Sequence, residues 1–135
     1  MKTFSVRTVD ELAPVAEEFF LTFGSPAIFL LHGHMGAGKT TFVKALMNVM
    51  GAGTAQSPTF SIVNEYVNDV GIKIFHLDLY RVKSLEEALD FGVEEYLDSG
   101  AYIFIEWPDV ILPLLKEKTV AINMLDDNGV RKISF

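Results

Sequence analysis

A glycine-rich loop with an adjacent lysine and threonine constrains this chain more than any other feature. Gly33 to Thr41 reads GHMGAGKTT and satisfies the pattern G-x-x-x-x-G-K-[ST] of a phosphate-binding loop. Gly36 and Gly38 allow a tight turn in which backbone N–H groups can point inward around phosphates. Lys39 would supply a mobile positive charge for the β- and γ-phosphates, and the Thr40 hydroxyl would coordinate Mg²⁺. The loop therefore predicts a bound nucleoside triphosphate with its magnesium ion.

The stretches on either side of this loop favour the same interpretation. Residues 27–31, AIFLL, form an apolar run of the length expected of a parallel strand that is buried on both faces. From Lys39 onward, apolar residues recur at helical spacing as far as Gly51, which is typical of a helix end. A glycine turn that only joined a strand to a helix would not need the Lys-Thr pair, so the context favours nucleotide binding.

The overall composition limits the other classes of protein. The chain has 135 residues, 50% of them hydrophobic, which suits one compact domain spanning residues 1–135. It contains no cysteine, so disulfides, thiolate zinc sites and cysteine catalysis are excluded. We see no secretion signal and no apolar run long enough to cross a bilayer, so we expect a cytoplasmic protein with no membrane partner. The net charge of −7 argues against gripping nucleic acid through a broad basic face.

The remaining segments predict alternating strands and helices. Strands are expected at residues 3–6, 61–67, 72–77, 101–105, 119–125 and 130–135. Helices are expected from about 12 to 23, 39 to 50, 85 to 91 and 93 to 97, with a further helical segment at 111–115. Thr8 and Glu11 have the spacing of a helix capping box, and Pro14 should kink the first helix or delay it by a turn. The Asn128-Gly129 pair predicts an antiparallel hairpin.

These elements predict an α/β fold, a three-layer P-loop NTPase-like domain. Its mixed sheet should have a parallel centre, with the strands at 27–31 and 101–105 in the interior, and antiparallel strands at the edge. Helices should cover both faces of the sheet. Ligands in such sheets bind beyond the C-terminal ends of the strands, so polar residues at those ends are the first candidates for a site.

Two carboxylates stand where such a domain needs a second metal ligand. Asp78 ends the segment IKIFHLD and Glu106 ends AYIFIE, so each follows an apolar strand. Both could therefore reach the magnesium region from neighbouring strands. The residues alone do not rank the two acids, because an acid after a strand can also cap a helix or a solvated turn.

Three further residues have both a structural and a functional interpretation. Thr59, within SPTF, lies where P-loop switch proteins carry a loop that senses the γ-phosphate, although Ser-Pro-Thr is also ordinary turn chemistry. His76 is interpreted as a hydrogen-bonded core residue rather than a metal ligand. Trp107, within EWP, is expected to line the nucleotide site, whereas the other large apolar side chains fill the core.

Four motifs in this order, GAGKTT, SPTF, H-x-D-x-Y-R and E-W-P, closely resemble the bacterial TsaE family. The combined H-x-D-x-Y-R and E-W-P motifs are much more specific than the loop alone, and the resemblance covers about residues 8–131. Members are small P-loop ATPases needed to make threonylcarbamoyladenosine, the modified nucleoside beside the anticodon of tRNAs that read codons beginning with adenosine. This chain departs from the family at His34 and Met35, where an acidic residue and leucine are common.

The resemblance implies roles for individual residues. Six consecutive loop residues would hold the phosphates of ATP: Gly36, Ala37, Gly38, Lys39, Thr40 and Thr41. Four side chains are the candidates for catalysis: Lys39, Thr59, Asp78 and Glu106. Of these, Glu106 would bind Mg²⁺ together with Thr40, Asp78 would orient water or the outer shell of the metal, and Thr59 would be the switch residue. Glu11 would form part of the rim near the base, and Arg131 is a further candidate for nucleotide contact.

The resemblance also implies a biochemical setting. In the family, a partner complex of TsaD and TsaB transfers the threonylcarbamoyl group, using an intermediate that a separate synthase makes from threonine, bicarbonate and ATP. This chain would then be an Mg²⁺-dependent ATPase, slow alone, that meets tRNA only through this complex and resets it by hydrolysis. An acidic surface agrees with docking onto basic partners. No arginine is obviously placed as an internal finger, and Arg81 is the one contender.

Two other functions stay open at this point. A small-molecule kinase would share the loop and the size, but it needs an acceptor site and usually a lid arginine, and residues 84–100 contain acids and no arginine. A docking module gated by nucleotide would bind ATP and change shape without hydrolysis. Phosphate transfer to an added metabolite would favour the kinase, and tight binding without turnover would favour the docking module.

Overall fold

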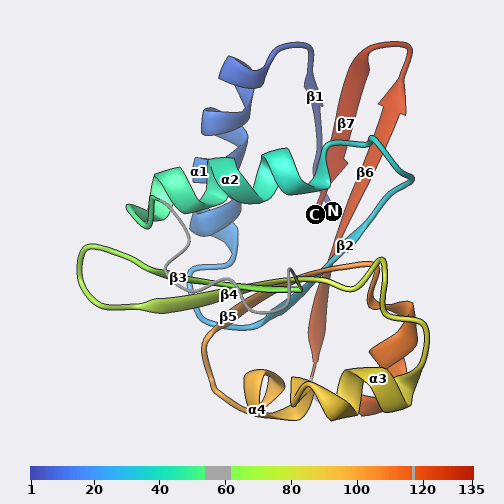
Figure 1. Ribbon diagram of the computed structural model, residues 1–135. Coiled ribbons are helices and arrows are strands. Elements are labelled where there is room, and N and C mark those ends of the chain that lie inside the picture. The colour runs from blue at the N-terminus through green and yellow to red at the C-terminus, as the bar shows by residue number, and fades with distance from the viewer. Residues whose placement is uncertain (54–61, 117) are drawn as a thin grey trace.

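The computed structural model describes residues 1–53, 62–116 and 118–135. A seven-stranded sheet runs through the molecule in the order β1-β7-β6-β2-β5-β4-β3 (Figure 1). Its strands are β1 (Thr3–Val6), β2 (Ile28–His32), β3 (Val63–Val67), β4 (Lys73–Asp78), β5 (Tyr102–Glu106), β6 (Thr119–Asp127) and β7 (Val130–Ser134). The helices are α1 (Leu12–Thr22), α2 (Lys39–Met50), α3 (Leu85–Asp90) and α4 (Val93–Leu97), with 3-10 helices η1 (Val9–Glu11) and η2 (Pro108–Leu114).

The centre of the sheet is parallel and its edges are antiparallel, as the sequence predicts. Strands β6, β2, β5 and β4 run parallel to one another. At one edge β3 is antiparallel to β4, and at the other β7 is antiparallel to β6 and β1 to β7. Because β2, β4 and β5 share one direction, their C-terminal ends reach the same edge of the sheet as the glycine-rich loop.

Helices cover both faces of the sheet and enclose two hydrophobic cores (Figure 1). Helices α1 and α2 lie over one face, and α3, α4 and η2 lie over the other. Strand β2 supplies both cores, since Phe29 and Leu31 pack on the side of α1 and α2, while Ile28 and Leu30 face the opposite side. This explains why its sequence is a continuous apolar run rather than an alternating one.

The ends of the helices follow local backbone chemistry. Helix α2 starts at Gly38 with φ of 95° and ends at Gly51 with φ of 75°, left-handed conformations that glycine adopts without strain. The first helix begins at Leu12, as expected, directly after the 3-10 turn η1. The helical segment expected at 111–115 is the 3-10 helix η2, because the ring of Pro113 removes a backbone N–H within it.

The two ends of the chain are also paired through their backbones. The backbones of Lys2 and Phe135 exchange N–H···O bonds of 2.8 and 3.0 Å, which extends the pairing of β1 with β7. Among the described residues, no helix is both long and apolar enough to cross a membrane.

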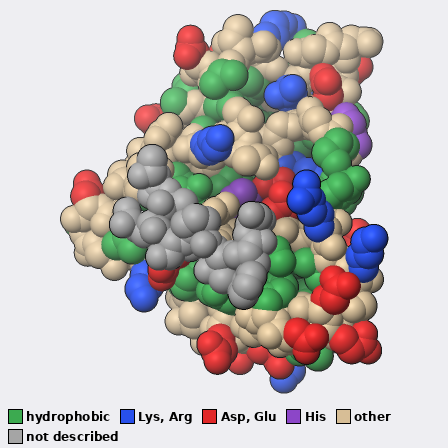
Figure 2. Space-filling model, in the orientation of Figure 1, with side chains coloured by type: hydrophobic (Ala, Val, Ile, Leu, Met, Phe, Trp, Pro, Cys, Tyr) green, Lys and Arg blue, Asp and Glu red, His purple; other side chains and the backbone are tan. Residues whose placement is uncertain are grey.

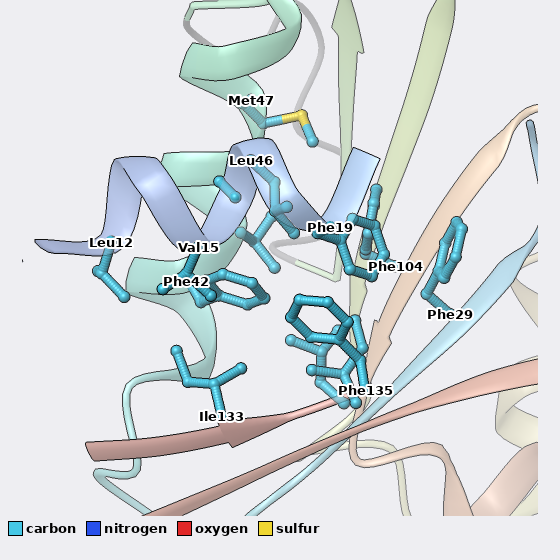
Figure 3. Packing of buried hydrophobic residues seen from close by; sticks show 14 of the residues in the cluster. Leu12, Val15, Phe19, Phe29, Phe42, Leu46, Met47, Phe104, Ile133 and Phe135 are labelled. Atoms are coloured by element: carbon cyan, nitrogen blue, oxygen red, sulfur yellow. The ribbon is translucent and has the colours of Figure 1, made fainter. Parts of the chain in front are cut away.

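Phe19 of α1 lies at the centre of an aromatic cluster that fixes α2 against the sheet (Figure 3). Its ring centroid is 5.0 Å from that of Phe29 on β2, 5.2 Å from that of Phe135 and 6.4 Å from that of Phe42 on α2. Since Phe42 belongs to the helix that begins at the glycine-rich loop, this packing also determines where the loop lies.

We therefore expect Phe19→Ala to lower the free energy of unfolding by about 3–5 kcal/mol, because a fully buried aromatic ring is removed and a cavity remains. Leu21→Ala is the matched control on the same helix, since Leu21 is 81% exposed, and it should change stability by less than about 0.5 kcal/mol. Urea denaturation followed by circular dichroism measures both. Equal losses would contradict the central position of Phe19.

Candidate functional site

A cavity of about 330 Å³ lies where the C-terminal ends of the parallel strands meet the glycine-rich loop. It is bordered by that loop, by the start of α2, by the ends of β4 and β5 and by one side chain of β7. Most of the residues predicted for the site line it: Gly36, Gly38, Lys39, Thr40, Thr41, Asp78, Glu106, Trp107 and Arg131. Residues from four separate elements are thus brought to one place.

The carboxylate of Glu106 links three of these elements. Glu106 is only 3% exposed, and its Oε2 accepts a hydrogen bond of 2.8 Å from the Thr40 hydroxyl at the start of α2. The same oxygen lies 2.6 Å from Nε2 of His76 on β4. An ionised carboxylate can only accept, so the histidine nitrogen donates. Strands β4 and β5 and helix α2 therefore share one buried oxygen atom.

The surroundings keep this buried carboxylate ionised. Burial favours the neutral form and raises the pKa of Glu106, but His76, the Thr40 hydroxyl and the charge of Lys39 together outweigh it. The pKa of Glu106 therefore lies below its ordinary value. A negative charge is present at neutral pH where the loop would hold phosphates, which suits a metal cation placed between the two.

Lys39 is held between the loop and an aromatic ring. Its ammonium donates to the backbone oxygen of Gly33 and lies 3.5 Å from the centre of the Trp107 ring. Burial lowers the pKa of Lys39, and the negative charges of Glu106, Asp78 and Asp109 oppose that shift. The lysine is 5% exposed, so its charge is directed into the cavity region rather than into bulk solvent.

Trp107 has the backbone of a strained residue. Its φ of 57° and ψ of 58° are left-handed, which is costly for a side chain of this size. The strain falls directly after Glu106, the last residue of β5. Its ring is also 5.2 Å from that of Tyr80, which is 55% exposed, so an aromatic pair borders the cavity. Backbone strain of this kind is common at functional sites.

Asp78 both stabilises a turn and lines the cavity. Its Oδ1 accepts a 3.1 Å hydrogen bond from the backbone N–H of Tyr80, so it stabilises the turn after β4. It also lines the cavity, paired in register with Glu106 on the neighbouring strand. The structure thus places both acids at the site, with only Glu106 bonded to the Thr40 hydroxyl.

Arg131 of β7 lies directly against the loop. A Cβ atom built on Gly38 would come within 2.8 Å of its Nη1, so the arginine would have to shift, and the φ of 95° at Gly38 itself favours glycine. Arg131 lines the main cavity and also a second one of about 300 Å³, with walls that include Val6, Leu12 and Met124. Its Nε is buried and has no hydrogen-bond partner among the described residues.

Some predicted residues lie elsewhere. Oε1 of Glu11 accepts from the backbone N–H groups of Arg7 (3.1 Å) and Thr8 (3.0 Å), which confirms the capping box and turns the carboxylate toward the chain. Arg7 and Thr8 themselves line the second cavity. Ala37 is fully buried and does not line the cavity. Thr59 lies outside the described residues.

Two further observations correct or extend the residue-level hypotheses. Arg81 is exposed and does not line the cavity, whereas Arg131 does. His76 is the hydrogen-bonded core residue that was expected, but its partner is the site carboxylate. The H-x-D spacing contained the signal, since residues two apart on a strand share a face. Met35 is 60% exposed at the cavity rim, so the departure from the family pattern affects side chains there.

The loop after β2, the acids that end β4 and β5, and the parallel centre of the sheet define a P-loop NTPase-like domain. The family model described as "Threonylcarbamoyl adenosine biosynthesis protein TsaE" matches residues 6–133. The tRNA threonylcarbamoyladenosine biosynthesis protein TsaE of Borreliella burgdorferi is 43% identical over 101 residues, 74% of this chain and 73% of that protein. The protein of the same name from Aquifex aeolicus is 35% identical over 131 residues, 95% of this chain and 91% of that protein.

The chain therefore belongs to the TsaE family, and its pathway is the biosynthesis of threonylcarbamoyladenosine in tRNA. The fold agrees. The crystal structure of YdiB from Bacillus subtilis superposes with a TM-score of 0.73 at 27% identity, covering 98% of this chain and 82% of that one.

The low pKa of Glu106 predicts how stability depends on pH. Its stabilising contribution should be fully present above the unfolded-state pKa of 4.5 and be lost as the pH falls through the lower folded-state value. Because glutamine resembles the protonated acid, the difference in unfolding free energy between the wild type and Glu106→Gln should shrink in acid. Urea denaturation from neutral pH to about pH 3 measures it. Exposed Glu95→Gln is the control, and a difference for Glu106→Gln that does not change with pH would contradict the assignment.

Proposed function

We propose that this chain is an Mg²⁺-dependent ATPase subunit that supports threonylcarbamoyladenosine modification of tRNA together with the TsaD and TsaB transferase complex. The observation that carries the proposal is the convergence of Lys39, Thr40 and Glu106 at one cavity beside the glycine-rich loop. Membership of the TsaE family supports the pathway. The chain itself is not the transferase in this proposal, and tRNA meets it through the complex.

The oxygen atoms at the site fit a magnesium ion. Neighbouring ligands of an octahedral Mg²⁺ at 2.0–2.1 Å are about 2.9 Å apart, close to the 2.8 Å between Thr40 Oγ1 and Glu106 Oε2. Magnesium in phosphate sites commonly takes one or two protein ligands and completes its shell with phosphate oxygens and water. Thr40 and Glu106 would hold the ion, and it would neutralise charge on the phosphates when bound.

The other residues of the site would bind the phosphates and the base of ATP. Backbone N–H groups of residues 36–41 would cradle the phosphates, and Lys39 would exchange the Gly33 oxygen for phosphate oxygens. The second cavity, with both apolar and polar walls, is the proposed place for the base, because Arg131 borders both cavities and would contact the nucleotide between them. Arg7 and Thr8, which precede Glu11 in the chain, line this second cavity and would form the rim of the base site.

Asp78 is the proposed residue that orients water. One of its carboxylate oxygens is engaged by the backbone of Tyr80, and the other can accept from a water molecule beside the metal. Among the described residues, Arg131 is the arginine that lines the cavity, and it lies against the phosphate loop. We infer that hydrolysis is slow in the isolated protein and that the partner complex raises it.

The charge distribution supports docking onto a basic partner. Acidic side chains gather at the end of the molecule that carries α3 and α4 (Figure 2). Six exposed acids lie on these two helices and the residue after them: Glu86, Glu87, Asp90, Glu94, Glu95 and Asp98. Such a surface would steer a basic partner or a complex that already holds tRNA.

Lys39→Ala and Glu106→Ala should each lower ATP hydrolysis by about 10²- to 10³-fold in the presence of partners and tRNA, because each removes a charge aimed at the phosphates or metal. Nucleotide binding should fall further with the lysine change. Lys44→Ala, an exposed lysine on the same helix, is the control and should keep wild-type rates. Release of phosphate and calorimetric binding of ATP are the measurements, and wild-type hydrolysis by either site variant would overturn the assignment.

The full proposal is tested by purified protein mixed with TsaD, TsaB, tRNA and ATP. We expect ATP to be converted to ADP and free phosphate, and tRNA modification to require this chain. Phosphate appearing on an added metabolite would instead identify a kinase, and tight ATP binding with no turnover would identify a docking module. Absence of both hydrolysis and any effect on modification would overturn the proposal.

A further inference from the structure

We propose that His76 is a positioning residue that fixes the carboxylate of Glu106 in the orientation that receives magnesium. The inference rests on the proposed function, since it takes Glu106 as a metal ligand, but it assigns a role to a histidine that itself lies outside the cavity. The positions on either side of His76 in β4 are apolar, and His76 is the buried polar residue between them.

The strand register places the two side chains together. Strands β4 and β5 are parallel, with His76 opposite Phe104 and Asp78 opposite Glu106. Residues two apart share a face, so His76, Asp78 and Glu106 all point to the side of the sheet that α2 covers. His76 is therefore the diagonal neighbour of Glu106, fixed to it through two central strands rather than through a loop.

The hydrogen bonds of Glu106 fix one of its carboxylate oxygens and thereby orient the other. Oε2 receives both Thr40 Oγ1 at 2.8 Å and His76 Nε2 at 2.6 Å. Within residues 1–53, 62–116 and 118–135, no hydrogen bond is made to Oε1. With Oε2 held from two sides, rotation of the carboxylate is restricted, and both the site-facing edge of Oε2 and the whole of Oε1 are presented in a constant geometry.

The two hydrogen-bond donors to Glu106, His76 and Thr40, differ in their other contacts at the site. Thr40 belongs to the loop and is itself proposed to contact the metal, so its bond to Glu106 depends on the state of the site. His76 is 3% exposed, does not line the cavity and has its Nε2 engaged by Glu106. It is thus a partner of Glu106 with no contact of its own in the cavity, which suits a residue that orients a metal ligand.

The test compares three substitutions at one position. In His76→Gln, the amide nitrogen reaches about as far as Nε2 and can donate to Glu106. His76→Asn carries the same amide on a shorter side chain, with its nitrogen closer to the place of Nδ1, and His76→Leu has no donor. The affinity of each folded variant for a non-hydrolysable ATP analogue is measured by calorimetry with Mg²⁺ and with a chelator, and thermal unfolding without metal confirms that each is folded.

We expect the gain in affinity that Mg²⁺ gives the wild type to persist in His76→Gln and to fall about 10- to 100-fold in His76→Asn and His76→Leu. Affinity without metal should be the same in all four proteins. On the background of Glu106→Gln, His76→Leu should cause no further loss, because the histidine acts through that carboxylate.

Three results would overturn the inference. His76→Leu or His76→Asn could keep the full magnesium effect, His76→Gln could lose as much as His76→Leu, or all variants could lose metal-free affinity equally, which would indicate a purely structural role. If the wild type itself gains no affinity from Mg²⁺, the proposed metal site fails and this inference with it. That failure appears in the wild type, so it is distinguishable from a failure confined to His76.

Discussion

The site depends on one buried oxygen, Oε2 of Glu106, which accepts hydrogen bonds from α2 and from β4. A buried carboxylate is costly unless it is hydrogen-bonded and balanced by charge, so this arrangement is stable only when the strands are in register and the helix starts in the right place. The pKa of Glu106 stays low for the same reason. Correct folding and a charged, ordered site are therefore coupled in this domain.

Apolar packing on one face of the sheet supplies the required position of α2. Phe19 connects α1, α2, β2 and the C-terminal residue, and Arg131 of β7 lies close to Gly38 in the loop that begins α2. The core on the opposite face of the sheet includes residues near the ends of β4 and β5 and so helps to position those ends. The polar site thus lies at the edge of two cores that share one sheet, and the rigid parallel centre of that sheet supports the side chains proposed to bind the metal.

The glycine-rich loop alone would suit a kinase, a switch protein or a transporter. What distinguishes this domain is the pair of acid-ended strands with the histidine before one acid and the tryptophan after the other. In the structure these four residues lie around the Lys39 and Thr40 side chains, with contacts from Trp107 to the lysine and from Glu106 to the threonine. The sequence motif that distinguishes the family therefore corresponds to residues that lie together in the structure.

The sequence by itself determined the loop, the strand and helix around it, both hairpins and the two acids at strand ends, because each depends on the backbone preferences of consecutive residues. Only the tertiary structure decided which acid bonds Thr40, 66 positions away, and that His76 supports it. It also brought Arg131 of β7 close to Gly38. These contacts follow from strand order and register, which bring together residues that are distant in the sequence.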